Sequence, residues 1–400
     1  DIAGRRRLLL GGLLLFTTAS LACAVAPTLW PLIAARAVQG LGAAIMLALS
    51  MALVGEAVPK ERTGSAMGLL GTMSAVGTAL GPSLGGLLIA GFGWRAIFLV
   101  NVPLGIVTFL LAYRYLPAER RVTTTDRAAF DVVGTLLLAL TLAAYALAMT
   151  IGRGQFGALN VGLLALTVAG AGLFMLAERR AASPLLRLAM FGDRGRNAGF
   201  AMSALVATVM MTTFVVGPFY LARGLGLDAA LVGLTMSAGP LVAALNGVPA
   251  GRVVDRFGAR HMTVAGLVAM AAGAGLLSGV PTRFGVPAYV AGIVVLTAGY
   301  ALFQAANNTA VMTGIRADQR GVVSGLLNLS RNLGFITGAS AMGAVFALAS
   351  AAVDIAAAPP AAVATGMRVT FAVAAAAIFG AIVLALSSPR FRGDERSEVA

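Results

Sequence analysis

Long apolar runs, each sufficient to cross a lipid bilayer as one helix, recur along the whole of this 400-residue sequence. About 20 apolar residues in a helix span the hydrocarbon core of a membrane. Because backbone in lipid must satisfy its own hydrogen bonds, we interpret these runs as transmembrane helices. The twelve predicted spans are 8–28, 32–55, 65–90, 96–115, 131–151, 160–177, 198–220, 229–250, 262–280, 287–312, 322–350 and 369–388.

The composition agrees with a membrane as the solvent. Hydrophobic residues make up 59% of the chain and charged residues 11%, whereas about a quarter of the residues in soluble domains are charged. A soluble fold of this length has too little interior to hide so much apolar surface. We therefore expect an all-α polytopic membrane protein.

The net charge of +14 raises the question of a nucleic-acid partner. Most of the basic residues, however, lie in alternate short loops between the apolar runs, without a basic face interleaved with aromatic residues. Cytoplasmic loops of membrane proteins collect Arg and Lys. The pattern predicts that these loops and the C-terminus are cytoplasmic, that the surroundings are a lipid bilayer, and that nucleic acid is not a partner.

The sequence offers little for enzyme chemistry. Cys23 and His261 are each the single residue of their type, so neither an intramolecular disulfide nor a Cys/His metal cluster can form. There is no Gly-Lys-Ser/Thr phosphate loop and no pattern of a nucleophile with its base. We expect no enzyme activity, no metal and no cofactor. A channel or a non-transporting sensor is the rival class, and a channel should show a filter or charged rings, which are absent from the sequence.

An internal repeat indicates two related halves, as is common in transporters. The repeat pairs residues 1–6 with 255–260 (255 − 1 = 254), and it pairs Gly77 and Gly81 with Gly334 and Gly338 (334 − 77 = 257). In the second copy, two spans that begin near Asn197 precede Asp255, and 255 − 197 = 58. On this interpretation, about 58 residues and two spans would precede Asp1 in the complete protein.

The predicted spans at 131–151 and 160–177 have no place in a duplication of six spans, so we interpret them as a pair inserted between the halves. The expected domains are an N-terminal half, the inserted pair with its linkers, a C-terminal half of six helices, and a cytoplasmic tail. Their bounds are 1–115, 116–196, 197–388 and 389–400, respectively.

A loop motif of glycine, aspartate and arginine occurs twice. Its residues are Gly251, Asp255, Gly258 and Arg260 in the complete copy, and Asp1, Gly4 and Arg5 at the start of the chain. Glycine permits a tight turn between two spans. An aspartate near a helix end can pair with an arginine and form a latch that opens as the halves move. The alternative is that the arginines only set the topology, which leaves the spacing of the aspartate and glycine without a role.

A second motif is a glycine stretch interrupted by proline. Its residues are Gly77, Gly81, Pro82, Gly85 and Gly86. Glycine at every fourth position leaves one helix face without side chains, where another helix can approach closely. Pro82 removes an internal hydrogen bond and allows a bend. We interpret the stretch as a pivot; simple glycine packing is the alternative, and it leaves Pro82 unexplained.

Together with the stretch Arg36-Ala-Val-Gln39-Gly40, these motifs resemble the fourteen-span drug:proton antiporter family of the major facilitator superfamily (EmrB/QacA type). The resemblance extends along essentially the whole chain. It implies a major facilitator fold and export, because the glycine–proline stretch is associated with exporters. It also implies a proton-carrying carboxylate, which in this family is commonly in the first span, and the predicted spans of this chain hold no acid at mid-membrane.

The resemblance assigns proton coupling to Arg36 and Gln39. Insertion scales give an Arg at mid-membrane a cost of about 2.5–3.5 kcal/mol, so Arg36 should face a water-filled cavity or a carboxylate. The alternative is that Arg36, which lies near the outer end of its predicted span, extends its charged head to the interface.

Two polar stripes lie deeper in the apolar runs. They consist of Gln304, Asn307 and Asn308, and of Asn328, Arg331 and Asn332. The spacing i, i+3, i+4 places each set on one helix face, and polar groups in lipid are costly, so both faces should point into the bundle. We hypothesise that they line the substrate path, with an adaptable apolar wall formed by Met210, Met211, Phe214, Phe219 and Tyr220. Interhelical hydrogen bonding for the stripes, and lipid or helix contacts for the apolar wall, are the alternatives.

These expectations combine into an inner-membrane exporter of bacterial type that exchanges amphipathic, cationic organic compounds for protons by alternating access. The expected partners are a small organic substrate, protons and the bilayer, and the need for a periplasmic adaptor is left open. The alternatives are an exporter dedicated to one metabolite of its own cell and an importer.

Overall fold

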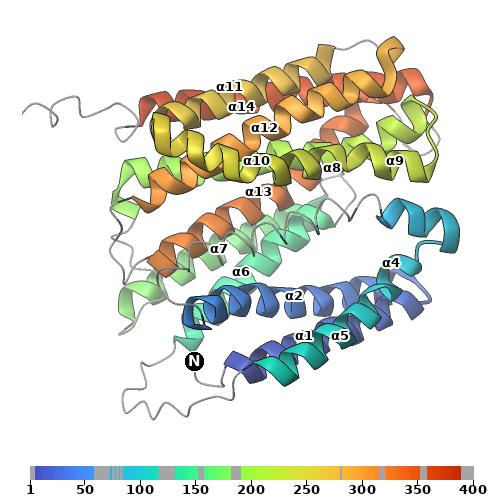
Figure 1. Ribbon diagram of the computed structural model, residues 1–400. Helices are drawn as coiled ribbons and strands as arrows, with labels where there is room; N and C mark the ends of the chain where they lie inside the picture. Colours follow the sequence, from blue (N-terminus) through green and yellow to red (C-terminus); the bar gives the residue numbers. More distant parts are fainter. Residues whose placement is uncertain are drawn as a thin grey trace, which may run out of the picture. The chain divides into compact units, whose positions relative to one another are not determined.

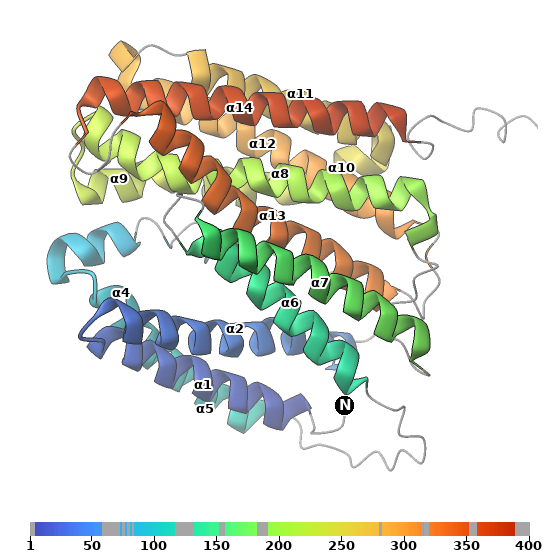
Figure 2. The ribbon, with the colours of Figure 1, turned by 180° about the vertical axis from the view of Figure 1, so that it is seen from behind.

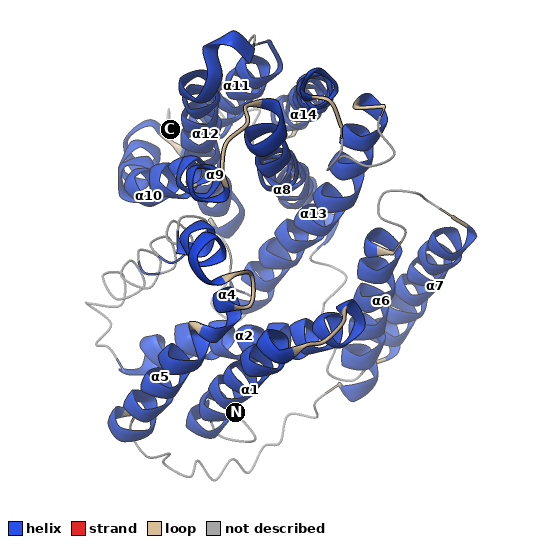
Figure 3. Ribbon diagram, turned by 90° about the vertical axis from the view of Figure 1, so that its right-hand side faces the viewer, coloured by secondary structure: helices blue, strands red, loops and turns tan. Residues whose placement is uncertain are grey.

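The computed structural model describes residues 5–57, 73, 77, 81, 84–116, 131–151, 157–181, 191–279, 282–313, 315, 320–351 and 358–388. Within these residues the regular elements are helices, and no strand occurs (Figure 3). Eleven helical segments of this part are long and apolar enough to cross a membrane. The prediction of an all-α polytopic membrane protein is confirmed. The predicted span 65–90 lies mostly outside the described residues, as does the tail 389–400.

The chain divides into two compact units. The first unit comprises Asp1–Thr125 and Asp228–Ser237, and the second comprises Asp126–Leu227 and Ala238–Ala400. The helices of the first unit are α1 (Arg5–Val25), α2 (Leu29–Ala57), α4 (Ala96–Leu99), α5 (Asn101–Tyr115) and α9 (Ala229–Met236). Residues 84–92 of the same unit are also helical.

The second unit holds the remaining helices, including a short π-helix, η3, and a short 3-10 helix, η4 (Figure 1). They are α6 (Val132–Thr150), α7 (Ala158–Arg180), α8 (Arg194–Phe219), η3 (Tyr220–Gly224), α10 (Ala238–Phe257), α11 (Ala259–Gly279), η4 (Thr282–Phe284), α12 (Gly285–Met312), α13 (Arg320–Ala349) and α14 (Pro360–Ser387).

Several helix ends follow directly from single residues. Asp131, Asp193 and Asp228 precede α6, α8 and α9, and the side chain of each accepts hydrogen bonds from backbone N–H groups of the first turn. Such caps satisfy donors that the helix itself leaves unpaired. Gly258 is the one residue between α10 and α11, and its φ of +82° is a conformation that glycine adopts at little cost.

Glycines also bring α13 close to α8 in the second unit. A Cβ added at Gly334 would lie 2.2 Å from the carbonyl oxygen of Ala204, and one at Gly338 would lie 2.5 Å from that of Thr208. No side chain fits in so short a gap, so the two backbones are in direct contact. This packing fixes α8 and α13 against each other, and both helices line cavities of the second unit.

The helices α6 and α7, which correspond to the predicted inserted pair, form a helical hairpin. At its turn, the Asn160 side chain donates hydrogen bonds to the carbonyl oxygens of Ala148 and Ile151. Figure 2 shows the hairpin beside α13, and the hydroxyls of Tyr145 and Thr337 form a hydrogen bond between α6 and α13. The pair therefore belongs to the same compact unit as the predicted C-terminal half.

Candidate substrate pocket and coupling site

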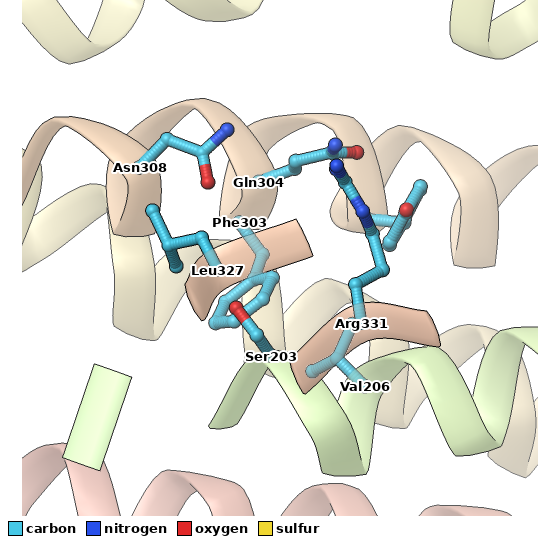
Figure 4. Close-up of a pocket in the computed structure, with 8 residues that line it drawn as sticks. Ser203, Val206, Phe303, Gln304, Asn308, Leu327 and Arg331 are labelled. Carbon is cyan, nitrogen blue, oxygen red and sulfur yellow. The ribbon is translucent and has the colours of Figure 1, made fainter. Parts of the chain in front are cut away.

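A small polar pocket lies in the second unit between α8, α12 and α13 (Figure 4). It is lined by Ser203, Val206, Tyr300, Phe303, Gln304, Asn308, Leu327 and Arg331. The enclosed space is about 10 Å³, which is room for a single water molecule. The pocket thus gathers hydroxyl, amide and guanidinium groups inside helices that are otherwise strongly apolar.

Arg331 supplies the charge of the polar pocket. Its guanidinium donates a hydrogen bond to Oδ1 of Asn328, which lies one turn earlier on α13. Figure 4 shows the same guanidinium beside the side-chain amide of Gln304, and it also lies close to the Tyr300 hydroxyl. No acidic side chain is among the described residues that line the pocket. The pocket can therefore offer a positive charge and several hydrogen-bond donors to a bound molecule.

The residues of the polar stripe on α12 have two different roles: two line the pocket and one bonds to a neighbouring helix. Gln304 and Asn308 line the polar pocket. Asn307 is fully buried and turns to α8, where its Nδ2 donates to the Gly199 carbonyl oxygen at 3.1 Å and to Ser203 Oγ at 2.9 Å. For Asn307, these hydrogen bonds agree with the alternative interpretation of the stripe, which is hydrogen bonding between helices.

The residues of the polar stripe on α13 also lie in different surroundings, and so do those of the predicted apolar wall. Asn328 and Asn332 are exposed, and of the stripe's three residues Arg331 is the one that lines the pocket. Met211 lies on α8 at a different, apolar cavity, and the side chain of Phe214 is 41% exposed. The assignment of all these residues to a substrate path stays a prediction.

A second polar cluster lies between α1 and α2 of the first unit. Arg36 donates to Oε1 of Gln39, and Gln39, which is 2% exposed, donates to Ser20 Oγ at 2.7 Å. The Arg36 guanidinium lies 5.8 Å from the centre of the Phe98 ring, a cation–π distance. The described residues bring no carboxylate within 4 Å of Arg36. The cluster therefore holds the positive charge of Arg36, an exposed residue, by neutral partners.

Sequence reasoning missed Ser20 as the partner of Gln39 and Phe98 as the aromatic neighbour of Arg36. Each lies in a separate apolar run, and the sequence does not tell which faces of two helices meet. The run 8–28 holds several hydroxyls, among them Thr17, Thr18 and Ser20. Each of these three donates to a carbonyl oxygen of its own helix, so their presence does not single out Ser20.

The glycine–proline stretch has one close contact among the described residues. A Cβ added at Gly86 would lie 2.8 Å from the Ala229 carbonyl oxygen and 3.1 Å from Cα of Gly233, both on α9. At Gly77, Gly81 and Gly85 no described atom lies within 4 Å of such a Cβ. Pro82 lies outside the described residues. The pivot stays a prediction, with Gly86 as its point of close approach.

The loop motif is described in its complete copy. Gly251 and Asp255 are on α10, Gly258 forms the turn to α11, and Arg260 lies in the first turn of α11. In the described part of the chain, no guanidinium lies within 4 Å of the exposed Asp255 carboxylate. In the other copy Asp1 and Gly4 lie outside the described residues, as does the side chain of Arg5. The latch stays a prediction.

Comparison with known proteins gives one consistent family. The model of the Major Facilitator Superfamily matches residues 1–339 and 199–398. Multidrug resistance protein Stp of Mycobacterium tuberculosis is 32% identical over 351 residues, which cover 87% of this chain and 64% of Stp. Riboflavin transporter RibZ of Clostridioides difficile is 27% identical over 87% of this chain and 75% of its own length.

A solved structure of a D-xylose–proton symporter resembles this chain with a TM-score of 0.68 at 15% identity, over 98% of this chain and 83% of the symporter. At that identity the likeness concerns the fold alone. The chain spans 64% of the length of Stp, so the activity, substrates and partners of the whole protein are matters of proposal.

Proposed function

Because this chain belongs to the major facilitator superfamily, we propose that it exports small organic compounds across a bacterial cell membrane in exchange for protons. The relative Stp is named a multidrug resistance protein, and the glycine–proline stretch resembles the motif of exporters. In this proposal the protein is of the fourteen-span drug:proton type, has its C-terminus in the cytoplasm, and works by alternating access of two halves.

The observation that carries the proposal is the polar pocket. Polar side chains within transmembrane helices are costly and mark substrate or ion paths. Gln304 and Asn308 on α12 and Arg331 on α13 point to one place, although they come from different spans. A guanidinium with neighbouring amides suits the hydrogen-bond acceptors of an organic molecule, and the pocket, with its space of about 10 Å³, would have to widen during transport to admit one. A cationic substrate would have to hold its charge away from Arg331.

Proton coupling is proposed for the cluster around Arg36. An antiporter needs a group that takes and releases a proton as it faces each side, and a carboxylate is the usual choice. An arginine keeps its proton in proteins, so Arg36 cannot be that group itself. Fixed in place by Gln39 and Ser20, it instead serves as the partner charge that favours the ionised form of such a carboxylate.

A second candidate is a transporter dedicated to one compound of its own cell. RibZ, a relative over most of this chain, is named a riboflavin transporter. The two candidates differ in substrate range, because a multidrug exporter accepts several unrelated compounds and a dedicated one does not.

Ethidium efflux from cells that express the full-length gene tests the proposal. We expect efflux above that of cells with the empty vector, and we expect a protonophore to abolish the difference. Efflux that persists with the protonophore would contradict proton coupling. No efflux of ethidium or of other unrelated dyes, together with a single compound accumulating in the medium, would favour the dedicated exporter.

A further inference from the structure

We propose that α6, together with α8 and α13, forms the walls of a second binding site, which takes an uncharged lipophilic molecule. This apolar cavity lies within the second unit between α6, α8 and α13 and has a volume of about 500 Å³. It is lined by Met149, Thr150, Met211, Val215, Phe219, Phe335, Ile336, Ala339, Ser340, Gly343, Phe346 and Ala347. None of these residues lines the polar pocket.

The chemistry of the walls sets the class of ligand. The described residues that line the apolar cavity carry no charge, and most are Met, Phe or aliphatic. The Thr150 hydroxyl is already bonded to the Ala146 carbonyl of its own helix at 2.7 Å. A charged group buried there would lack a partner, which is strongly unfavourable. Methionine and phenylalanine instead adapt to apolar molecules of differing shape.

The size of the apolar cavity fits a small molecule. Pockets that hold drug-sized ligands have volumes of about 300–1,000 Å³, and this cavity falls in that range. The cavity lies among helices that are long and apolar enough to span a membrane. Lipophilic molecules dissolved in the bilayer can therefore enter the cavity from the lipid. We therefore assign the ligand as an aromatic or alkyl group that partitions into lipid, either a free lipophilic compound or the acyl chain of a lipid.

Helix α6, through Met149 and Thr150, gives the apolar cavity its third wall. The hydrogen bond between Tyr145 and Thr337 holds α6 against α13, and Met149 lies one turn after Tyr145 on the same face of α6. At another part of the wall, the rings of Phe219 and Phe346 pack with their centres 6.0 Å apart. Helix α6 is thus a structural part of a site in the second unit.

Photolabelling of the purified full-length protein in lipid nanodiscs tests this site. The probe is adamantyl diazirine, which is uncharged, and mass spectrometry locates the labelled peptides. We expect saturable labelling of the peptides that contain Met149 on α6 and Phe335 on α13. Ala347→Trp fills the cavity and should weaken this labelling at least about tenfold. The matched control, Ala143→Trp, changes an exposed position of α6 and should leave labelling unchanged.

Met149→Trp fills the cavity from the opposite wall and serves if Ala347→Trp does not fold. Labelling that is unsaturable, or absent at both peptides, or equal in the filled variants and the control, would overturn the proposal. Absence at both peptides would mean that another part of the protein fills the space. These results are independent of ethidium efflux, so failure of this proposal and failure of the proposed function can be told apart.

A second arm separates the two sources of the ligand. Nanodiscs are prepared with a phosphatidylcholine that carries a diazirine on its acyl chain. Labelling of the same two peptides by this lipid, reduced by an excess of adamantane, identifies bilayer acyl chains as occupants. Labelling by the free probe alone identifies a free lipophilic compound. Either result supports the site, and labelling by neither overturns it.

Discussion

At the scale of single residues, Arg36 is the group on which the proposed coupling depends. Its guanidinium is held by Gln39 and, through it, by Ser20 on the neighbouring helix. Arg36→Gln removes the charge but keeps a hydrogen-bonding side chain of similar reach. We expect proton-driven efflux to fall to the level of the empty vector, while the amount of folded protein in the membrane is retained. Fluorescence-detected size-exclusion chromatography and dye efflux measure the two.

The control for Arg36→Gln is Arg283→Gln, which removes one positive charge from an exposed position beside Phe284. This variant should transport at the original rate. Equal efflux by both variants would remove Arg36 from the coupling mechanism.

Residue patterns predicted the polar positions better than their partners. The spacing of Gln304 and Asn308 placed them on one face of α12, and both do line one pocket. The direction of Asn307 depends on α8, which passes close enough to accept its hydrogen bonds. A helix face is a local property of the sequence, whereas the identity of the neighbouring helix is a property of the packed bundle. Ser20 could not be linked to Gln39 for the same reason.

At the scale of helices, the glycine–proline stretch offers a matched pair of variants. Gly86 is in close contact with the backbone of α9, and at Gly85 no described atom lies within reach of an added methyl group. Gly86→Ala should force the helical residues 84–92 away from α9, at a cost of roughly 1–3 kcal/mol. We expect a lower melting temperature and slower efflux for this variant, and values near those of the original protein for Gly85→Ala.

Equal behaviour of Gly85→Ala and Gly86→Ala would show that the contact with α9 has no part in stability or transport. Because both changes are from glycine to alanine at adjacent helical positions, the difference in helix propensity cancels between them.

Some helix boundaries followed the apolar runs closely, both with and without a side-chain cap. The run 287–312 corresponds to α12, Gly285–Met312, and the run 131–151 to α6, which begins after the cap Asp131. The interruptions within spans were harder to predict. The run 229–250 is divided at Ser237 between α9 and α10, and α8 passes into the π-helix η3 just after Pro218. Proline weakens the regular hydrogen bonding of a helix, but its presence does not specify which irregular turn comes next.

At the scale of the whole molecule, composition and the spacing of apolar runs were sufficient to predict the class of protein, because a bilayer admits few kinds of spanning structure. The family match agrees with that class along nearly the full chain. The placing of the inserted pair beside α13 was not predictable, since it depends on the Tyr145–Thr337 bond and on the shape of α13. The predicted internal repeat assigns this hairpin no counterpart, so the repeat could not be used to deduce its position.

The most direct test of exchange of a compound for protons is made with the purified full-length protein in sealed liposomes that contain a pH-sensitive dye. A proton gradient is imposed across the liposome membrane, and ethidium is added outside once the internal pH has become constant. We predict that ethidium causes proton movement in the opposite direction, and that Arg36→Gln abolishes this movement. Ethidium uptake without any change of the internal pH, in liposomes that hold their imposed gradient, would contradict the account.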